Sequence, residues 1–416
     1  MAMSNENIQL LDEEDENLFA QARDAGHKLD PRAQKIFVLV VVLLAVYFVG
    51  LIIPKDMLNS ALHNAGYASG YSFAWFLQDL QENVNGLVAV LTGNDNGPKS
   101  YASLMIRYVV IALSGAGLAV CGAVYQGTFK NALVSPSTLG VMSGATLGMM
   151  VWVVFFVNDD GSNVAWLGSN ASNAAAAQDP FGYLMSSYSL AILSFVGCLL
   201  IVSLVLLVMR LAGGMSGIMM IITGQVIGGI TGAISNTIRY YYVAGNPYGP
   251  KAQLLTDLAI ASFYRQFTWI DLIALGVPLI ATFAVVMHFR QRMMALSLSA
   301  EETRALGVDT KRMRIIVVGL CTLLTAIIVS FCGTVGFVGF LVPHLARRLV
   351  GPNFTYLLPM ATVMGAVFVL TAYILMSATL GPDYETMVGM FISIGGATVF
   401  LVTALSGKGG SRGQFQ

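Results

Sequence analysis

Residues 36–54 read IFVLVVVLLAVYFVGLIIP, a stretch without a single charge. A helix needs about 20 mostly apolar residues to cross a bilayer, and this stretch meets that need. The whole chain of 416 residues has the same character, because 56% are hydrophobic and only 11% are charged. A soluble domain carries roughly 25% charged residues. The sequence therefore predicts an integral membrane protein.

Nine further stretches of this kind follow, so we expect an all-α polytopic membrane protein with about ten transmembrane helices. The expected spans are 36–54, 101–126, 138–157, 183–209, 216–242, 268–289, 313–332, 336–350, 355–378 and 385–405. The eighth is short for a full crossing. Residues 252–264 are also too short to span, and we expect a re-entrant or interfacial helix there.

The basic residues predict the orientation, because lysine and arginine concentrate in cytoplasmic loops. If the N-terminus is cytoplasmic and the spans alternate, sixteen of the 22 basic residues fall inside and six fall outside. This places an acidic tail, 1–35, and a short tail, 406–416, in the cytoplasm on either side of the membrane domain, 36–405. The polar stretches 55–100 and 158–182 then face outward.

Several classes of protein lack support in this sequence. The formal charge is 22 basic against 22 acidic residues, so no basic excess favours nucleic acid. No acidic residue lies deep in an expected span, which disfavours an ion-coupled secondary transporter. The only stretch that resembles the phosphate-binding motif GxxxxGK[ST] is SGKGG at 406–410, and it lacks the first glycine and the final Ser/Thr of that motif. We therefore expect neither an enzyme nor a metal site, and no covalently bound cofactor.

Small residues at four-residue spacing mark helix contact faces in lipid. The fifth expected span carries such a series, with two polar side chains on the same helix: Gly224, Gly228 and Gly232, with Gln225 and Asn236. One interpretation is ordinary helix packing, and the other is that this span lines a pathway. Gly144 and Gly148 repeat the pattern in the third span.

Two other segments depart from a uniform span. The stretch 333–343, GTVGFVGFLVP, has a glycine at every third position, and this density favours a tight break between two helices. The stretch 288–314 is too polar to cross the membrane. It is either a solvated loop or a pair of short cytoplasmic helices that contact a partner protein, the first of them ending at Gly307.

Three stretches, in order, resemble the FecCD-like permease subunits of type II ABC importers for iron–siderophores, haem and cobalamin. The first is 115–148, with a QGxxxN turn followed by PxxLGxxxG. The second is the coupling segment 299–314, SAEETRALGVDTKRMR. The third is 333–352, GTVGFVGFLVPHLARRLVGP. Their order and spacing extend the resemblance over 101–405.

The resemblance implies partners: a second permease, either a copy or a paralogue, two ATP-binding subunits that use ATP, and an extracytoplasmic substrate-binding protein. It also implies a bacterial inner (plasma) membrane location. Residues that would lie within the cytoplasmic coupling segment 291–312 and contact the ATPase are Glu301, Glu302, Arg304, Ala305, Leu306 and Gly307. Residues expected along or beside the translocation pathway are Gln126, Asn131, Pro136, Ser143, Gln225 and Asn236. Arg107 would dock the binding protein.

Several features depart from the family pattern, among them the polar tail 1–35 and the stretch 158–182, which are additions to it. Asp383 and Glu385 stand at the outer end of the last expected span, where relatives more often carry neutral or basic groups. The resemblance implies an importer permease for an iron(III)–siderophore, with haem or cobalamin as other cargo. A secondary transporter and a structural or receptor-like membrane protein are the alternatives.

Overall fold

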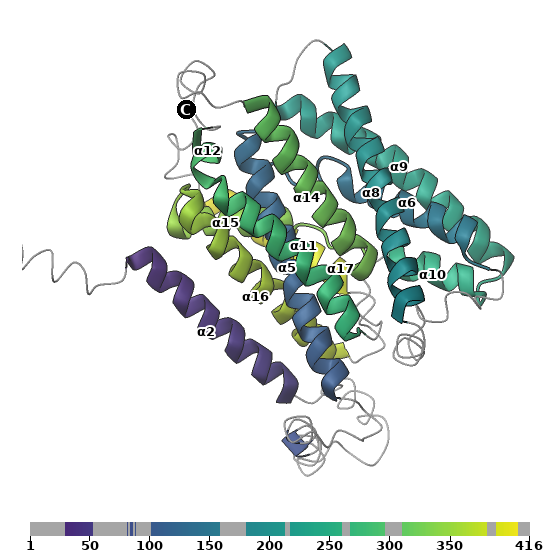
Figure 1. The fold of residues 1–416 in the computed structure, drawn as a ribbon, viewed down its shortest axis with the longest axis horizontal. Coiled ribbons are helices and arrows are strands. Elements are labelled where there is room, and N and C mark those ends of the chain that lie inside the picture. The colour runs from purple at the N-terminus through teal and green to yellow at the C-terminus, as the bar shows by residue number, and fades with distance from the viewer. Residues whose placement is uncertain are drawn as a thin grey trace, which may run out of the picture.

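The computed structural model describes residues 30–52, 101–158, 180–212, 217–259, 267–295, 310–380 and 388–406, and a few positions between 81 and 88. Every regular element in these ranges is a helix (Figure 1). The helices are α2 (Pro31–Ile52), α5 (Tyr101–Thr128), α6 (Val141–Phe156), α8 (Pro180–Leu211), α9 (Gly217–Gly245), α10 (Pro250–Ala259), α11 (Trp269–His288), α12 (Arg290–Ala295), α14 (Thr310–Cys332), α15 (Val338–Val350), α16 (Phe354–Leu380) and α17 (Val388–Ser406).

Each of the ten expected spans coincides with one of these helices. Six of them are long and apolar enough to cross a membrane by themselves: α2, α5, α8, α11, α14 and α16, each over most of its length. α6 and the first part of α17 are apolar but shorter. α15 has 13 residues, in agreement with the expected short eighth segment. The chain is thus an all-helical membrane protein.

The helices form two groups that share α14. In the first group, α5 lies at the centre and contacts α11, α14, α15 and α16. The second group contains α6, α8, α9 and α10, and α14 contacts both α6 and α8. Figure 1 shows α2 at one edge of the molecule and α8 and α9 at the opposite edge. Among the helices that the structure describes, α9 contacts α6, α8 and α10, and one of its sides is left exposed.

Pairs of glycines bring the backbones of neighbouring helices into contact. A Cβ at Gly122 of α5 would overlap the carbonyl group of Gly339 in α15, and one at Gly115 would overlap that of Gly365 in α16. Gly144 of α6 meets Gly197 of α8 in the same way. Close packing of this kind stabilises helix association in lipid, where burial of apolar surface provides no driving force.

The expected break at the glycine-rich stretch is confirmed. α14 ends at Cys332 and α15 begins at Val338. Between them, Gly333 has a φ of 70° and Phe337 a φ of 63°. Both lie in the left-handed region, which is uncommon for a side chain such as phenylalanine. The break turns the chain so that α15 packs on α5.

Candidate functional site

A buried polar contact joins the C-terminal part of α5 to α15. Gln126 is 2% exposed, and its amide Nε2 donates a hydrogen bond of 3.0 Å to the carbonyl of Phe340. Its Oε1 accepts one of 2.9 Å from a guanidinium nitrogen of Arg347. Buried polar groups need such partners, because an unpaired one costs free energy. The structure therefore places Gln126 in a contact between helices of the same chain.

The turn from α5 to α6 is held by its own polar side chains. Asn131 accepts a 2.9 Å hydrogen bond from the backbone N–H of Leu133 through its side-chain oxygen, and its own N–H donates to the carbonyl of Gln126. Pro136 is buried, and a Cβ on Gly339 would lie 3.1 Å from its Cδ. Asn131 and Pro136 thus shape the loop that leads into α6.

The start of α6 packs against α9 through small residues. Gly140 has a φ of 74° and caps α6. A Cβ added to it would lie 3.1 Å from the carbonyl oxygen of Gly224, and one on Gly228 would lie 3.3 Å from the hydroxyl of Ser143. Packing therefore explains the first two glycines of the series in the fifth span. Gly232 differs, because an added Cβ would meet nothing within 4 Å.

The open side of α9 is divided into two strips. Residues three or four positions apart lie on one face of a helix. The polar strip consists of Gln225, Gly229, Gly232, Asn236 and Tyr240. The apolar strip consists of Val226, Ile230, Ile234 and Tyr241. Gln225 and Asn236 are both exposed, so the structure brings these two predicted pathway residues onto one face.

The polar strip is unlike the exposed side of α2. On α2, every exposed residue from Ile36 to Gly50 is apolar. Exposed amides on α9 would face hydrocarbon if this side touched lipid, and polar groups inside a membrane instead face protein or water-filled cavities. The polar strip is therefore suited to line an aqueous path or to contact another protein chain.

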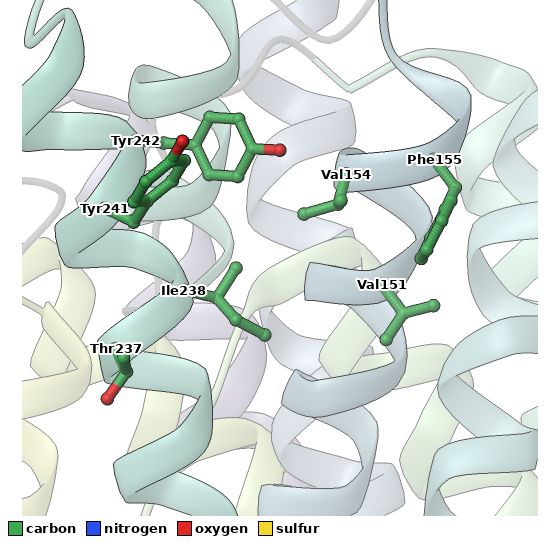
Figure 2. Close-up of a pocket in the computed structure, with 7 residues that line it drawn as sticks. All are labelled: Val151, Val154, Phe155, Thr237, Ile238, Tyr241 and Tyr242. Atoms are coloured by element: carbon green, nitrogen blue, oxygen red, sulfur yellow. The ribbon is translucent and has the colours of Figure 1, made fainter.

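A cavity of about 320 Å³ lies beside the apolar strip, between α9 and α6 (Figure 2). Ile238 and Val154 point toward each other across it, and Tyr242 projects toward α6 (Figure 2). Its lining comprises Val151, Val154, Phe155, Thr237, Ile238, Tyr241 and Tyr242. The segment expected at 252–264 is helical from Pro250 to Ala259, as α10, and packs against α6 and α9.

Arg107 lies in the N-terminal half of α5. It is partly buried, and a guanidinium nitrogen donates a 3.4 Å hydrogen bond to the hydroxyl of Tyr373 in α16. Its docking role stays a prediction. The six coupling residues, from Glu301 to Gly307, and the acids Asp383 and Glu385 fall outside the described residues. Helix α12 ends at Ala295 and helix α14 begins at Thr310, so both helices reach into the expected coupling segment 291–312.

The most buried acidic residue in the described ranges has a local structural role. Asp271 is 1% exposed, and its carboxylate accepts hydrogen bonds from the backbone N–H (2.8 Å) and hydroxyl (3.0 Å) of Thr268. This is a capping box that starts α11. Within the described ranges, no three His, Cys, Asp or Glu side chains gather as a metal site would require.

Two features of this site were missed from the sequence. Arg347 belongs to the PHLAR stretch, but its pairing with Gln126 joins positions 221 residues apart, and no local pattern signals such a contact. The tyrosines at the end of α9 were also overlooked, although four of them within 240–248 are conspicuous among the chain's 16.

Comparisons with known proteins agree with this architecture. A "Probable iron chelatin transport system permease protein" of Helicobacter pylori (strain 26695) is 30% identical over 295 residues, covering 71% of this chain and 78% of the relative. The cobalamin import system permease protein BtuC of Halobacterium salinarum is 28% identical, covering 71% of this chain and 70% of the relative. The Fe(3+)-citrate import system permease protein YfmE of Bacillus subtilis is 27% identical, and the match covers 71% of this chain and 78% of the relative.

A solved structure has the same fold. It is an inward-facing conformation of an ABC transporter assigned to the metal-chelate type, with a TM-score of 0.63 and 24% identity, and the match covers 90% of this chain and 99% of that chain. The model of the FecCD transport family matches residues 71–406, which is most of the chain and includes both strips of α9. The chain belongs to the FecCD transport family.

Proposed function

We propose that this chain is the membrane permease subunit of an ATP-driven importer that moves an iron(III)–siderophore or a related metal chelate. Family membership over 71–406 carries the proposal. Relatives are named as permeases for iron chelatin, Fe(3+)-citrate and cobalamin. The chain itself acts in transport, and separate subunits hydrolyse ATP.

The open side of α9 supports pairing with a second permease, either a copy or a paralogue. Polar groups on this side need a surrounding other than lipid. If two chains face each other there, the polar strips line a path between them. Gly229 and Gly232, where an added Cβ would meet nothing, leave that path wide for a bulky chelate.

The remaining partners follow from family membership. A substrate-binding protein delivers the chelate at the outer face, and two ATPase subunits bind the cytoplasmic coupling segment 291–312. With the N-terminus in the cytoplasm, both chain ends and the coupling segment lie on the ATPase side. We place the assembly in the inner (plasma) membrane of a bacterial cell.

The test is uptake of a radioiron-labelled siderophore by proteoliposomes that contain the permease, its ATPase subunits and its binding protein. Uptake should require ATP inside the vesicles and should persist with a proton uncoupler. Uptake that survives without ATP and collapses with the uncoupler would instead identify an ion-coupled carrier. Haem and cobalamin, offered in the same assay, distinguish the cargo classes.

A further inference from the structure

Helices α6 and α9 are in close contact at their N-terminal ends and leave an opening toward their C-terminal ends. The backbones meet at the start, because a Cβ on Gly140 would lie 3.1 Å from the carbonyl oxygen of Gly224. The cavity of about 320 Å³ lies further along, between residues 151–155 and 237–242, and we call this opening the wedge (Figure 2). Small-molecule sites have volumes of about 300–1,000 Å³. The wedge is therefore large enough to hold part of a ligand.

The lining of the wedge is suited to hydrocarbon. Four of its seven residues are aliphatic or phenylalanine. The hydroxyl of Thr237 donates a 2.9 Å hydrogen bond to the carbonyl of Ala233 in its own helix, so this group needs no polar ligand. Phe155 is 77% exposed and Tyr241 is 74% exposed, so the wedge opens to the surroundings of the two helices. Because both helices are expected spans, an acyl chain of the bilayer can enter there.

The open end of the wedge combines aromatic and basic side chains. Tyr241 and Tyr242 lie there, and tyrosines are enriched where hydrocarbon meets the lipid headgroups. Lys251, in the first turn of α10, has its Nζ 5.7 Å from the ring centre of Tyr242. Arg239 lies three positions before Tyr242, a spacing that places both residues on one face of α9. The stretch 217–249 contains no acidic residue. Two basic residues thus accompany Tyr242 at the expected headgroup level.

We propose that the wedge is a binding site for an anionic phospholipid of the surrounding bilayer, with one acyl chain in the cavity and the phosphate beside Arg239 and Lys251. The chain gains packing contacts with the apolar lining, and basic groups near a membrane surface attract anionic lipids. A polar metal chelate fits this cavity poorly, because its polar groups would find few hydrogen-bond partners there. The bound lipid would hold the diverging ends of α6 and α9 at a fixed spacing.

Ordinary bilayer lipid is the alternative occupant, because any acyl chain can fill an apolar gap. Lipid held only by its chain would show no preference for the charge of the headgroup. The proposed site should instead bind an anionic headgroup more tightly than a zwitterionic one, by about fivefold for each basic group that contributes. The headgroup preference therefore distinguishes a specific site from a gap filled by any lipid.

The test is photocrosslinking of the full chain in detergent micelles. The probe is phosphatidylglycerol with a diazirine in one acyl chain, and unlabelled phosphatidylglycerol or phosphatidylcholine competes with it. Mass spectrometry should locate the crosslink in peptides that contain residues 151–155 or 237–242. Phosphatidylglycerol should compete at least about fivefold more strongly than phosphatidylcholine. It should also raise the unfolding temperature, because a ligand that binds only the folded chain stabilises it.

Matched variants separate lipid binding from folding. Val154→Trp fills the cavity and should abolish both the crosslink and the rise in unfolding temperature, whereas Val277→Trp on the exposed side of α11 should preserve both. Arg239→Gln with Lys251→Gln should remove the headgroup preference. Arg210→Gln, at an exposed position in the last turn of α8, should keep it. Because the glutamine pair lies outside the cavity lining, it tests the proposal even if Val154→Trp does not fold.

Several results would overturn the inference. They are equal competition by the two lipids, a crosslink outside both peptides, and a crosslink that persists in folded Val154→Trp. Competition by a ferric trihydroxamate would assign the cavity to cargo, and a disulfide between two copies of Val154→Cys would assign it to a second permease; either result contradicts the lipid site. The lipid measurements need neither ATP nor cargo, so their outcome is independent of the proposed importer function.

Discussion

Gln126 and Arg347 connect α5 to α15 beside the helix break that the glycine-rich stretch creates. The Gln126 amide makes both of its hydrogen bonds to α15, one to a carbonyl and one to a guanidinium group. A hydrogen bond to a charged group contributes about 1.5–3 kcal/mol. The pair therefore contributes directly to the position of α15.

We predict that Gln126→Leu and Arg347→Met each lower the free energy of unfolding, and that their effects are not additive. Residues that share a hydrogen bond show coupling energies of about 0.5–3 kcal/mol in double-mutant cycles. Denaturant unfolding of the purified chain in detergent, for both single variants and the double variant, measures this coupling. Strict additivity would show that the two residues act independently.

A second residue-scale prediction concerns the contact between Gly122 and Gly339. A Cβ at position 122 would overlap a backbone carbonyl, which has no rotamer through which to move away. Gly122→Val should lower the yield of folded protein and its unfolding temperature, because overpacking costs about 1–3 kcal/mol or more.

The matched control is Gly319→Ala in α14, where an added Cβ meets nothing within 4 Å. This change should be neutral or stabilising by up to about 1 kcal/mol, because alanine favours a helix over glycine. If both variants behaved alike, the close approach of α5 and α15 would not be a determinant of stability.

At the scale of elements, α2 packs mainly against α16, and polar contacts near its N-terminus also hold it against the rest of the chain. Lys35 Nζ donates a 2.9 Å hydrogen bond to the carbonyl of Leu349, and the guanidinium of Arg32 lies 5.5 Å from the ring centre of Tyr356. The Asp30 carboxylate accepts hydrogen bonds from the backbone N–H of Arg32 and from the Tyr356 hydroxyl, and these lower the pKa of Asp30. The attachment is thus partly controlled by charge.

A lowered pKa makes the contribution of Asp30 dependent on pH. The stabilisation is present above the ordinary pKa of an aspartate, about 3.9, and is lost as the pH falls through the lower value in the folded chain. Unfolding temperatures of the wild type and Asp30→Asn should therefore differ slightly at pH 6 and converge once the pH lies below the lowered pKa of Asp30 in the folded chain. The comparison cancels other titrations, and a difference that persisted in acid would contradict this role.

The elements themselves were largely predictable from sequence. The expected spans 101–126 and 313–332 correspond to Tyr101–Thr128 and Thr310–Cys332, because a bilayer requires long apolar runs and their polar ends are distinct. The site was less predictable. Gln225 and Asn236 could be proposed together as pathway residues, because the spacing of residues along a helix determines which of them share a face. The partner of Gln126 was not found, because it depends on how α15 packs on α5.

At the scale of the whole molecule, the charges define the two faces. Sixteen of the 22 basic residues sort to one side in the expected topology. In that topology, the turn after α5, which includes Lys130, would lie on the cytoplasmic side, and the turn after α9, which includes Tyr248, would lie on the outer side. The proposed importer function depends on this orientation, because the proposed ATPase and binding-protein partners must bind opposite faces.

Single cysteines test the orientation. The four native cysteines are buried, so they should react poorly with a membrane-impermeant maleimide in the folded chain. In the turn after α9, Gly249 is buried and Pro247 is exposed, so position 247 is the one where a cysteine would be accessible. We therefore expect Pro247→Cys to be labelled in intact cells and Lys130→Cys only after permeabilisation, because a charged maleimide does not cross the bilayer. Labelling of Lys130→Cys in intact cells, with Pro247→Cys protected, would invert the topology and place the coupling segment outside, where ATPase subunits cannot bind it.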